Sequence, residues 1–549
     1  MKHCHPAPLS LSSTCRRTFQ TNYKEPTIYA LSTAPGRAAI AIIRCSGSHC
    51  LQIYKSLCPG TPDLKPRRAA VRTLYRSANG TDKPEIIDSQ ALVLFFSGPN
   101  TTTGEDVLEF HVHGGPAIVK AVLAAISKTV PQSPDRPPTV RYAEPGEFTR
   151  RAFYNNRLDL TQVEALGDTL SAETEQQRRL AVRGMSNALN YRYERWRKDL
   201  LYARGELEAF IDFSEDQHFD DSADDFVRSI FMQIHDLRKQ IQATRRNAAK
   251  GELLRNGIKV ALLGEPNAGK SSLLNQIVGR EAAIVSSEAG TTRDVIEVNV
   301  DIGGFFCKFN DLAGIRSNVQ GRKSIGEIEQ EGIKRAKAHA LEADVVIVVL
   351  PLEKASDGLR AYRIKVLAEI MDFVKSQLNR GQVIIYALSK SDLAGNDVES
   401  LLVEAKTVLE PYTDAAIICP VSCLTGQNSG LGSITVLDSS SIQDLLDNLV
   451  VSLKELTNAE EIGGAPKGAQ SFDESLGTTQ RQVLLLEQCD EQLSLFLQDI
   501  ETPAEVDVVL AAERLRSSAD CLAKITGRGE AGDVEQVLGV VFEKFCVGK

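Results

Sequence analysis

The chain has 549 residues, a length that predicts roughly three to four domains rather than a single core. Its formal net charge of −9 excludes a surface that attracts polyanions as a whole, so any nucleic-acid contact is local or shared with a partner. The most apolar run, Val345–Leu352, has the length of a buried strand, and no membrane span is expected. Eleven cysteines without C-x-x-C pairs indicate reduced thiols in an intracellular compartment rather than a disulfide framework.

Residues 1–25 differ in composition from the rest of the chain. They contain Lys2, Arg16, Arg17 and Lys24, several hydroxyl residues, and no acidic residue before Glu25. This pattern predicts an organellar transit peptide, mitochondrial in type. A disordered basic tail is the alternative.

Hydrophobic periodicity divides the remaining residues into four segments. Residues 26–155 contain apolar runs separated by Gly and Pro, which predicts a sheet domain of α+β type. Residues 156–255 and 453–549 show apolar spacings of three and four, which predict amphipathic helices, whereas residues 256–452 alternate strands and helices. The two helical segments can pack as one bundle with the α/β unit inserted, because insertions succeed where chain ends lie close together. The predicted fold class is therefore multidomain, α/β plus α.

The strongest motif is Gly264-x4-Gly269-Lys270-Ser271, between an apolar strand and a helical pattern. That context predicts a P-loop, in which backbone N–H groups and a helix N-terminus cradle phosphates. Lys270 would reach the β- and γ-phosphates and Ser271 would ligate Mg²⁺. The predicted phosphate contacts are Asn267, Ala268, Gly269, Lys270, Ser271 and Ser272.

Further segments in chain order predict guanine as the base and GTP as the nucleotide. "GTTRD" supplies the Thr292 hydroxyl for Mg²⁺, and "DLAG" supplies the Asp311 carboxylate and the Gly314 amide. "LSKSDL" supplies Asp392, whose carboxylate would accept from N1 and N2 of guanine, and "SCLTG" begins at Ser422 and would close the base pocket. The inserted unit is therefore predicted to be a P-loop GTPase domain of the Ras-like α/β type.

Three positions depart from the usual GTPase pattern. Ser389, before Lys390, replaces the usual Asn, and Leu312 replaces the usual Thr of D-T-A-G. Ile315 stands where Ras-like enzymes have the Gln that orients water, and an apolar side chain cannot do so. Asn267 and the segment "SSEAGTTRD" are candidates for a monovalent-cation site that supplies the missing positive charge.

Together with their neighbours, these residues resemble the MnmE (TrmE) family of tRNA-modification GTPases, in its mitochondrial branch. The resemblance covers nearly the whole chain after the leader and includes "PGRAAIAIIRCSG", "TTTGEDVLEFHVHGGP", "AEPGEFTRRAFYNNRLDLTQVEAL", "IDFSED", "GEPNAGKSSLLN", "REAAIVSSEAGTTRD" and "FCVGK". It implies a folate-binding, dimerising N-terminal domain, a helical domain and an inserted G domain, hence a homodimer.

The resemblance also implies site residues. Glu329 matches a glutamate that helps to organise the attacking water, and Arg157 stands where bacterial members have Lys, which keeps the charge and changes the geometry. The implied K⁺ ligands are Asn267, Ser286, Glu288 (through its backbone) and Thr291. The implied folate contacts are Arg44, Glu109, Arg157 and Lys549.

The family acts with the FAD-dependent partner MnmG, through which FAD and NADH enter. The pair adds a (carboxymethyl)aminomethyl-type group to C5 of the wobble uridine in certain tRNAs, with a tetrahydrofolate derivative as the one-carbon source. For this chain the resemblance implies mitochondrial tRNA as the substrate and the mitochondrial matrix as the compartment. Two other functions are considered: a ribosome-assembly GTPase, for which no basic RNA-binding appendage is visible, and a folate-dependent one-carbon transferase with a regulatory G domain.

The C-terminal "FCVGK" does not fit a prenylation signal, because Gly548 is not aliphatic and Lys549 is not a usual terminal residue. The resemblance implies that the tail presents a reactive Cys546 to the folate domain; a structural thiol at a helix end is the alternative. His111 and His113 alternate on one strand, and folate-pocket or core packing is favoured over metal ligation. Cys419 and Cys423 are expected to be core thiols.

Overall fold

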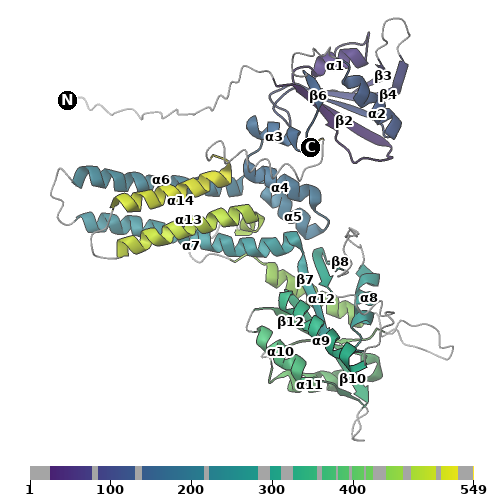
Figure 1. Ribbon diagram of the computed structural model, residues 1–549, viewed down its shortest axis with the longest axis vertical. Coiled ribbons are helices and arrows are strands. Elements are labelled where there is room, and N and C mark those ends of the chain that lie inside the picture. Colours follow the sequence, from purple (N-terminus) through teal and green to yellow (C-terminus); the bar gives the residue numbers. More distant parts are fainter. Residues whose placement is uncertain are drawn as a thin grey trace, which may run out of the picture. The chain divides into compact units, whose positions relative to one another are not determined.

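The computed structural model describes most of the chain, which Figure 1 draws as a ribbon. The described residues are 25–76, 85–129, 139–214, 222–281, 297–310, 325–354, 362–378, 381–394, 398–412, 416–423, 440–460, 472–501, 508–528 and 548. The predicted transit peptide lies outside them, except for Glu25. The chain divides into two compact units, Met1–Leu158 with Leu538–Lys549, and Asp159–Val537.

The first unit contains a six-stranded sheet with the order β3-β4-β5-β2-β1-β6. Its neighbouring strands pair antiparallel, except that β1 and β6 are parallel. The strands are β1 Thr27–Leu31, β2 Ile40–Ser46, β3 Ala70–Arg76, β4 Glu85–Phe96, β5 Val107–His113 and β6 Val140–Tyr142. The helices are α1 Cys50–Leu57, α2 Pro116–Ile126 and α3 Glu147–Tyr154.

The two faces of this sheet differ in polarity because successive side chains on a strand point to opposite sides. Ile43 and Phe110 belong to the apolar core that also includes side chains of α1 and α2. Arg44, Glu109 and His111 alternate with these core residues and are only partly buried. The face away from α1 and α2 therefore carries the charged groups.

The helical part of the second unit is a bundle in which α6, α7, α13 and α14 lie side by side (Figure 1). Tyr193, Trp196 and Leu200 recur at helical spacing on α6 and pack in one core with Phe496 and Leu515. Aspartate and threonine N-caps with capping boxes start α4 and α5. The elements are α4 Leu160–Ser171, α5 Glu175–Gly184, α6 Ala188–Ser214, α7 Ser222–Asn256, η2 Phe472–Gly477, α13 Gln480–Glu501 and α14 Val508–Thr526.

The rest of the second unit contains a seven-stranded sheet. Its order is β13-β12-β10-β7-β9-β8, with β11 paired to β10, and only the β8 and β11 pairings are antiparallel. The strands are β7 Ile258–Gly264, β8 Glu297–Ile302, β9 Phe305–Asn310, β10 Val345–Lys354, β11 Tyr362–Ile364, β12 Val383–Ser389 and β13 Ile417–Val421. The helices are α8 Lys270–Glu281, α9 Ile325–Glu342, α10 Ala368–Leu378, η1 Ser391–Ala394, α11 Val398–Leu409 and α12 Ser440–Thr457.

Two connections join this sheet to the helices of the same unit. Helix α7 passes into β7 through Gly257, whose φ of +91° favours glycine. At the β8–β9 turn, the carbonyl of Gly304 accepts a hydrogen bond of 3.0 Å from the backbone N–H of Gln176 on α5.

The prediction of a mixed α/β and helical chain is confirmed. Among the described helices, none has the length and apolar character of a membrane span.

A close contact between α7 and η2 generates a stability prediction. A Cβ at Gly251 would lie 1.8 Å from the carbonyl oxygen of Leu476, a distance that requires the backbone to shift. We expect Gly251→Ala to lower the free energy of unfolding by about 1–3 kcal/mol, measured from thermal and denaturant unfolding. Gly205 on α6 is the matched control because nothing lies within 4 Å of its Cβ position. Gly205→Ala should stabilise by about 0.5–1 kcal/mol through helix propensity, and equal stability of both variants would contradict the packing argument.

Candidate functional site

Four parallel strands of the seven-stranded sheet end at one edge. Gly264 at the end of β7 pairs with Val349 on β10, and Ser389 at the end of β12 pairs with Pro351 on β10 and with Val421 on β13. The loops that follow β7, β12 and β13 therefore leave the sheet at the same edge. In parallel α/β sheets this carboxyl edge is where ligands bind.

The loop after β7 has the backbone of a phosphate cradle. Asn267 and Gly269 have φ values of +63° and +96°, and α8 begins at Lys270. The Lys270 ammonium donates to the carbonyls of Gly264 at 2.8 Å and Glu265 at 2.7 Å. A turn of this kind followed by a helix N-terminus aims backbone N–H groups and positive potential at an anion. Ser271 and Ser272 follow in the first turn of α8.

Ser389, the departure from the usual Asn, lies against this loop. Its hydroxyl is buried and donates a hydrogen bond of 2.5 Å to the carbonyl of Ala268. The serine therefore connects the end of β12 to the phosphate loop directly. Lys390, the next residue, has a φ of +61° and starts the turn that leads into η1.

The two residues predicted to contact the base are in contact with each other. The Ser422 hydroxyl, just after β13, donates to Oδ1 of Asp392 in η1 at 2.9 Å. This bond orients the carboxylate and leaves Oδ2 as a further acceptor, which fits a group that must accept from two donors of guanine. The structure thus brings Asp392, Ser422, Ser389 and the phosphate loop together.

Other predicted residues lie outside the described residues or are described only by their backbone. Glu329 lies on α9, and its side chain is not described. The predicted residues outside the described ranges are Ser286, Glu288, Thr291, Thr292, Asp311, Gly314, Cys546 and Lys549. Their roles stay predictions.

The first unit brings two of the predicted folate residues together. Arg44 on β2 and Glu109 on β5 pair across the sheet, with a guanidinium–carboxylate distance of 2.8 Å. His111, which the sequence assigned to folate-pocket or core packing, lies 3.4 Å from the same carboxylate. Arg157 instead donates to the carbonyl of Thr101 at 2.9 Å, in the loop between β4 and β5.

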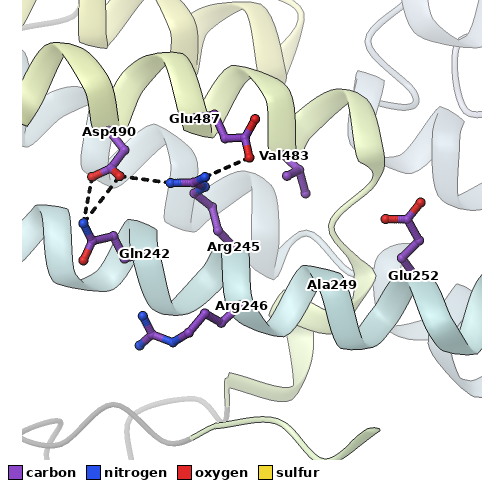
Figure 2. A pocket seen from close by; sticks show the side chains of 8 residues that line it. All are labelled: Gln242, Arg245, Arg246, Ala249, Glu252, Val483, Glu487 and Asp490. Atoms are coloured by element: carbon purple, nitrogen blue, oxygen red, sulfur yellow. Dashed lines mark hydrogen bonds and ion pairs between the residues drawn. The ribbon is translucent and has the colours of Figure 1, made fainter. Parts of the chain in front are cut away.

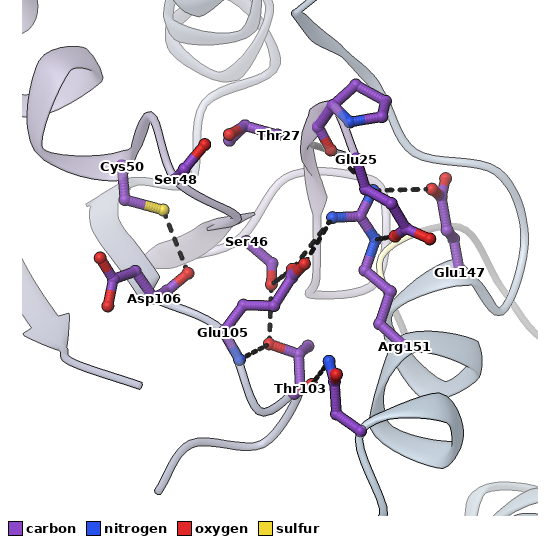
Figure 3. Close-up of polar contacts among 12 residues, drawn as sticks. Glu25, Thr27, Ser46, Ser48, Cys50, Thr103, Glu105, Asp106, Glu147 and Arg151 are labelled. Carbon is purple, nitrogen blue, oxygen red and sulfur yellow. Dashed lines mark hydrogen bonds and ion pairs between the residues drawn. The ribbon is translucent and has the colours of Figure 1, made fainter. Parts of the chain in front are cut away.

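A buried network fixes that loop (Figure 3). The guanidinium of Arg151, 3% exposed, lies 2.9 Å from Glu105 and 3.1 Å from Glu147. Glu105 also accepts from the Ser46 hydroxyl at 2.7 Å. Burial alone would lower the pKa of Arg151, but the two carboxylates outweigh it and raise the pKa. The network locks the loop between β4 and β5 to α3, which positions Arg157.

Gly548, near the chain end, belongs to this unit as well. Its carbonyl accepts a hydrogen bond of 3.0 Å from the Ser32 hydroxyl, just after β1. Its φ is +99°, and a Cβ there would lie 2.1 Å from the carbonyl oxygen of Leu31. Only glycine fits this place. No sequence pattern links Gly548 to Ser32, which is 516 positions away.

The remaining candidates are structural. A cavity of about 410 Å³ between α7 and α13 (Figure 2) contains none of the predicted residues. Its Arg245 is already bonded to Glu487 at 2.8 Å and Asp490 at 2.9 Å.

Cys419 is a core thiol, as predicted, and burial raises its pKa to about 11, which makes it unreactive. In the described part of the chain, no three His, Cys, Asp or Glu side chains gather as metal ligands.

The contact of Ser389 generates a prediction for nucleotide affinity. An asparagine retains a donor for the Ala268 carbonyl and adds a second polar group that reaches further toward the base. We expect Ser389→Asn to tighten GDP binding by up to about 1–1.5 kcal/mol, measured with a fluorescent GDP analogue. Ser389→Ala, which leaves the buried carbonyl unpaired, should weaken it. Unchanged affinity in Ser389→Asn would mean that another group already fills this role.

Comparisons with known proteins cover nearly the whole chain. Residues 27–157 match the model "GTP-binding protein TrmE N-terminus", and residues 160–546 match the model "MnmE helical domain". The chain is 36% identical over 541 residues to "tRNA modification GTPase mss1, mitochondrial" of Schizosaccharomyces pombe, covering 97% of this chain and 98% of that protein. It is 37% identical to "5-taurinomethyluridine-[tRNA] synthase subunit GTPB3, mitochondrial" of Homo sapiens, covering 95% and 93%. It is 38% identical to "tRNA modification GTPase MnmE" of Parvibaculum lavamentivorans, covering 95% and 100%. The resemblance seen in the sequence is thereby confirmed, and the chain belongs to the MnmE family of tRNA modification GTPases.

Proposed function

We propose that this chain is a GTPase that acts in mitochondria in the modification of C5 of the wobble uridine of tRNA. The observation that carries the proposal is the contact between Ser422 and Asp392 at the sheet edge that also holds the phosphate loop. A base acceptor and a phosphate cradle at one edge form a site for a guanine nucleotide. The family membership supports tRNA modification as the process that hydrolysis serves.

In this proposal the described residues of the nucleotide site have separate roles in binding the nucleotide and Mg²⁺. Lys270 would move from the loop carbonyls to the β- and γ-phosphates, Ser271 would ligate Mg²⁺, and Asp392 would accept from guanine N1 and N2. Bound Mg²⁺ supplies neutralisation of the charge that develops on the transferred phosphoryl group. Ser389 keeps the base-binding turn and the phosphate loop in register, because its hydrogen bond ends on Ala268.

We further propose a K⁺ site next to the phosphates, with Asn267 as one ligand. Ile315 offers no hydrogen bond to water, so positive charge must be supplied by another group. The left-handed backbone of Asn267 lies in the phosphate loop, where an amide oxygen can serve a monovalent cation. Ser286, Glu288 and Thr291 are the further proposed ligands, and Glu329 is the proposed water-organising group.

For the modification chemistry we propose that the first unit holds a tetrahydrofolate derivative. Arg44, Glu109 and Arg157 lie on or beside its sheet, and an arginine–carboxylate pair suits a ligand with both donors and an acidic tail. Gly548 packs against β1, whose Leu31 pairs with Ile43 next to Arg44. Cys546 is only two residues earlier in the sequence, and two residues span at most about 7 Å. Lys549 would contribute its charge to the same ligand.

The names of the relatives and the net charge of the chain support a proposal for the partners and the compartment. Two of the relatives named above are called mitochondrial, and one is called a subunit of a synthase. We therefore propose a mitochondrial matrix protein that works with an FAD-dependent MnmG-type subunit, which brings FAD and NADH. The net charge of −9 fits a chain that shares its tRNA contact with a partner. A homodimer through the first unit is proposed.

The cation proposal predicts the ion dependence of hydrolysis. GTP turnover should be fast in K⁺ and slow in Na⁺, and Asn267→Ala should lose the K⁺ stimulation while it retains GTP binding. Alanine also adds strain of about 1 kcal/mol in the left-handed region. Asn267→Gly is the matched control, because glycine also removes the side-chain amide but adopts the left-handed backbone conformation without strain. Both variants should lose the stimulation; wild-type rates that are equal in K⁺ and Na⁺ would refute the cation site.

The experiment that tests the coupled function compares hydrolysis and modification in one protein. Cys546→Ser should retain dimerisation and K⁺-stimulated hydrolysis while the modified wobble uridine disappears from mitochondrial tRNA. Gly548→Ala should act similarly, because its Cβ would displace the tail from Leu31. Gly60→Ala is the control, since its φ of +73° is also left-handed but nothing lies within 4 Å. If hydrolysis and modification fall together in Cys546→Ser, the tail is structural; if neither falls, the thiol is incidental.

A further inference from the structure

A carboxylate occupies the second position of the phosphate loop. Glu265 follows Gly264 directly, and the residue is 7% exposed. Its backbone carbonyl accepts from the Lys270 ammonium at 2.7 Å, so the residue adjoins the group that would hold the phosphates. A negative side chain at this place is unexpected, because it repels a polyanionic ligand unless it is neutralised.

The neutralising group comes from a hairpin outside the usual GTPase motifs. The Lys365 ammonium lies 2.9 Å from Oε2 of Glu265 and 3.0 Å from Oε1 of Glu353. Strands β10 and β11 form the hairpin by pairing Leu352 with Ile364, and the backbone N–H of Lys365 donates to the Pro351 carbonyl at 3.1 Å. The lysine is thus fixed by its backbone at the sheet edge that carries the phosphate loop.

The second carboxylate oxygen of Glu265 has no partner among the described residues that could take the place of Lys365. Among the described residues, Oε1 of Glu265 is buried and has no hydrogen-bond partner. If Lys365 is removed, neither oxygen of this carboxylate has an ionic partner among the described residues, and a nearly buried negative charge is left within the phosphate loop. An uncompensated buried charge is among the most costly defects in a protein.

We propose that Lys365 is a positioning residue of the nucleotide site, which neutralises Glu265 and holds the phosphate loop in its binding geometry. The proposal rests on the proposed function as a GTP-binding protein. It adds a determinant of nucleotide affinity that the GTPase motifs do not contain, because Lys365 follows β11 and reaches Glu265 from outside those motifs.

The test measures binding of a fluorescent GDP analogue and steady-state GTP hydrolysis with the full-length protein. Lys365→Met should weaken binding roughly tenfold to hundredfold, because a charged hydrogen bond is lost, and should raise KM with little change in kcat. Lys365→Arg should retain affinity near wild type. Lys354→Met, at the end of β10, is the matched control, because Lys354 forms no ion pair with the described residues, and this variant should bind the nucleotide normally.

The double variant separates charge compensation from mere support of the hairpin. Glu265→Gln/Lys365→Met removes the buried charge together with its partner and should restore most of the lost affinity. Equal weakness of the single and the double variant would overturn the proposal, as would unchanged binding in Lys365→Met. If the wild-type protein binds no guanine nucleotide, the proposed function itself is wrong, an outcome that is distinct from both.

Discussion

The register of strand β10 is the constraint on which the nucleotide site depends. This strand is buried along nearly its whole length and pairs in parallel with β7 on one side and β12 on the other. The pairing brings the ends of β7 and β12 to the same edge, with Gly264 beside Val349 and Ser389 beside Pro351. A slip of one residue would turn each side chain to the opposite face and separate the phosphate loop from Ser389. The hydrogen bonds from Ser389 to Ala268 and from Ser422 to Asp392 join residues at or just beyond the strand ends at this edge.

The seven-stranded sheet contacts the helical part of its unit at two places, so a conformational change in the sheet can reach the helices. Helix α7 continues into β7 after one glycine, and β7 leads into the phosphate loop. On the other side, the turn between β8 and β9 bonds to the start of α5. Strand β9 leads directly toward Asp311, where a bound nucleotide is proposed to act. A displacement of β9 would therefore shift α5, because rigid elements in direct contact transmit displacements to each other.

The sequence predicted what is local and could not predict what joins distant segments. The phosphate loop lies within eight consecutive residues between a strand and a helix, so its pattern was visible, and the structure has β7 and α8 there. The bond from Ser389 to Ala268 spans 121 positions, and the sequence shows only that Ser389 replaces the usual Asn. Lys365 carries no motif, and its importance appears only when its contact with Glu265 is seen. Arg44 and Glu109 were singled out through the family resemblance, and their direct pairing emerged only from the strand register. Long-range contacts are specified by the whole fold rather than by spacing in one segment.

The central claim is that this chain serves tRNA modification, and the most direct measurement is mass spectrometry of nucleosides from mitochondrial tRNA of a strain that lacks the gene. The account predicts that a 5-substituted uridine present in the parent strain is lost and returns when the wild-type gene is restored. Quantifying mitochondrial ribosomal subunits in the same strain gives the comparison. Unchanged tRNA nucleosides together with missing ribosomal subunits would contradict the account and would indicate a GTPase of ribosome assembly.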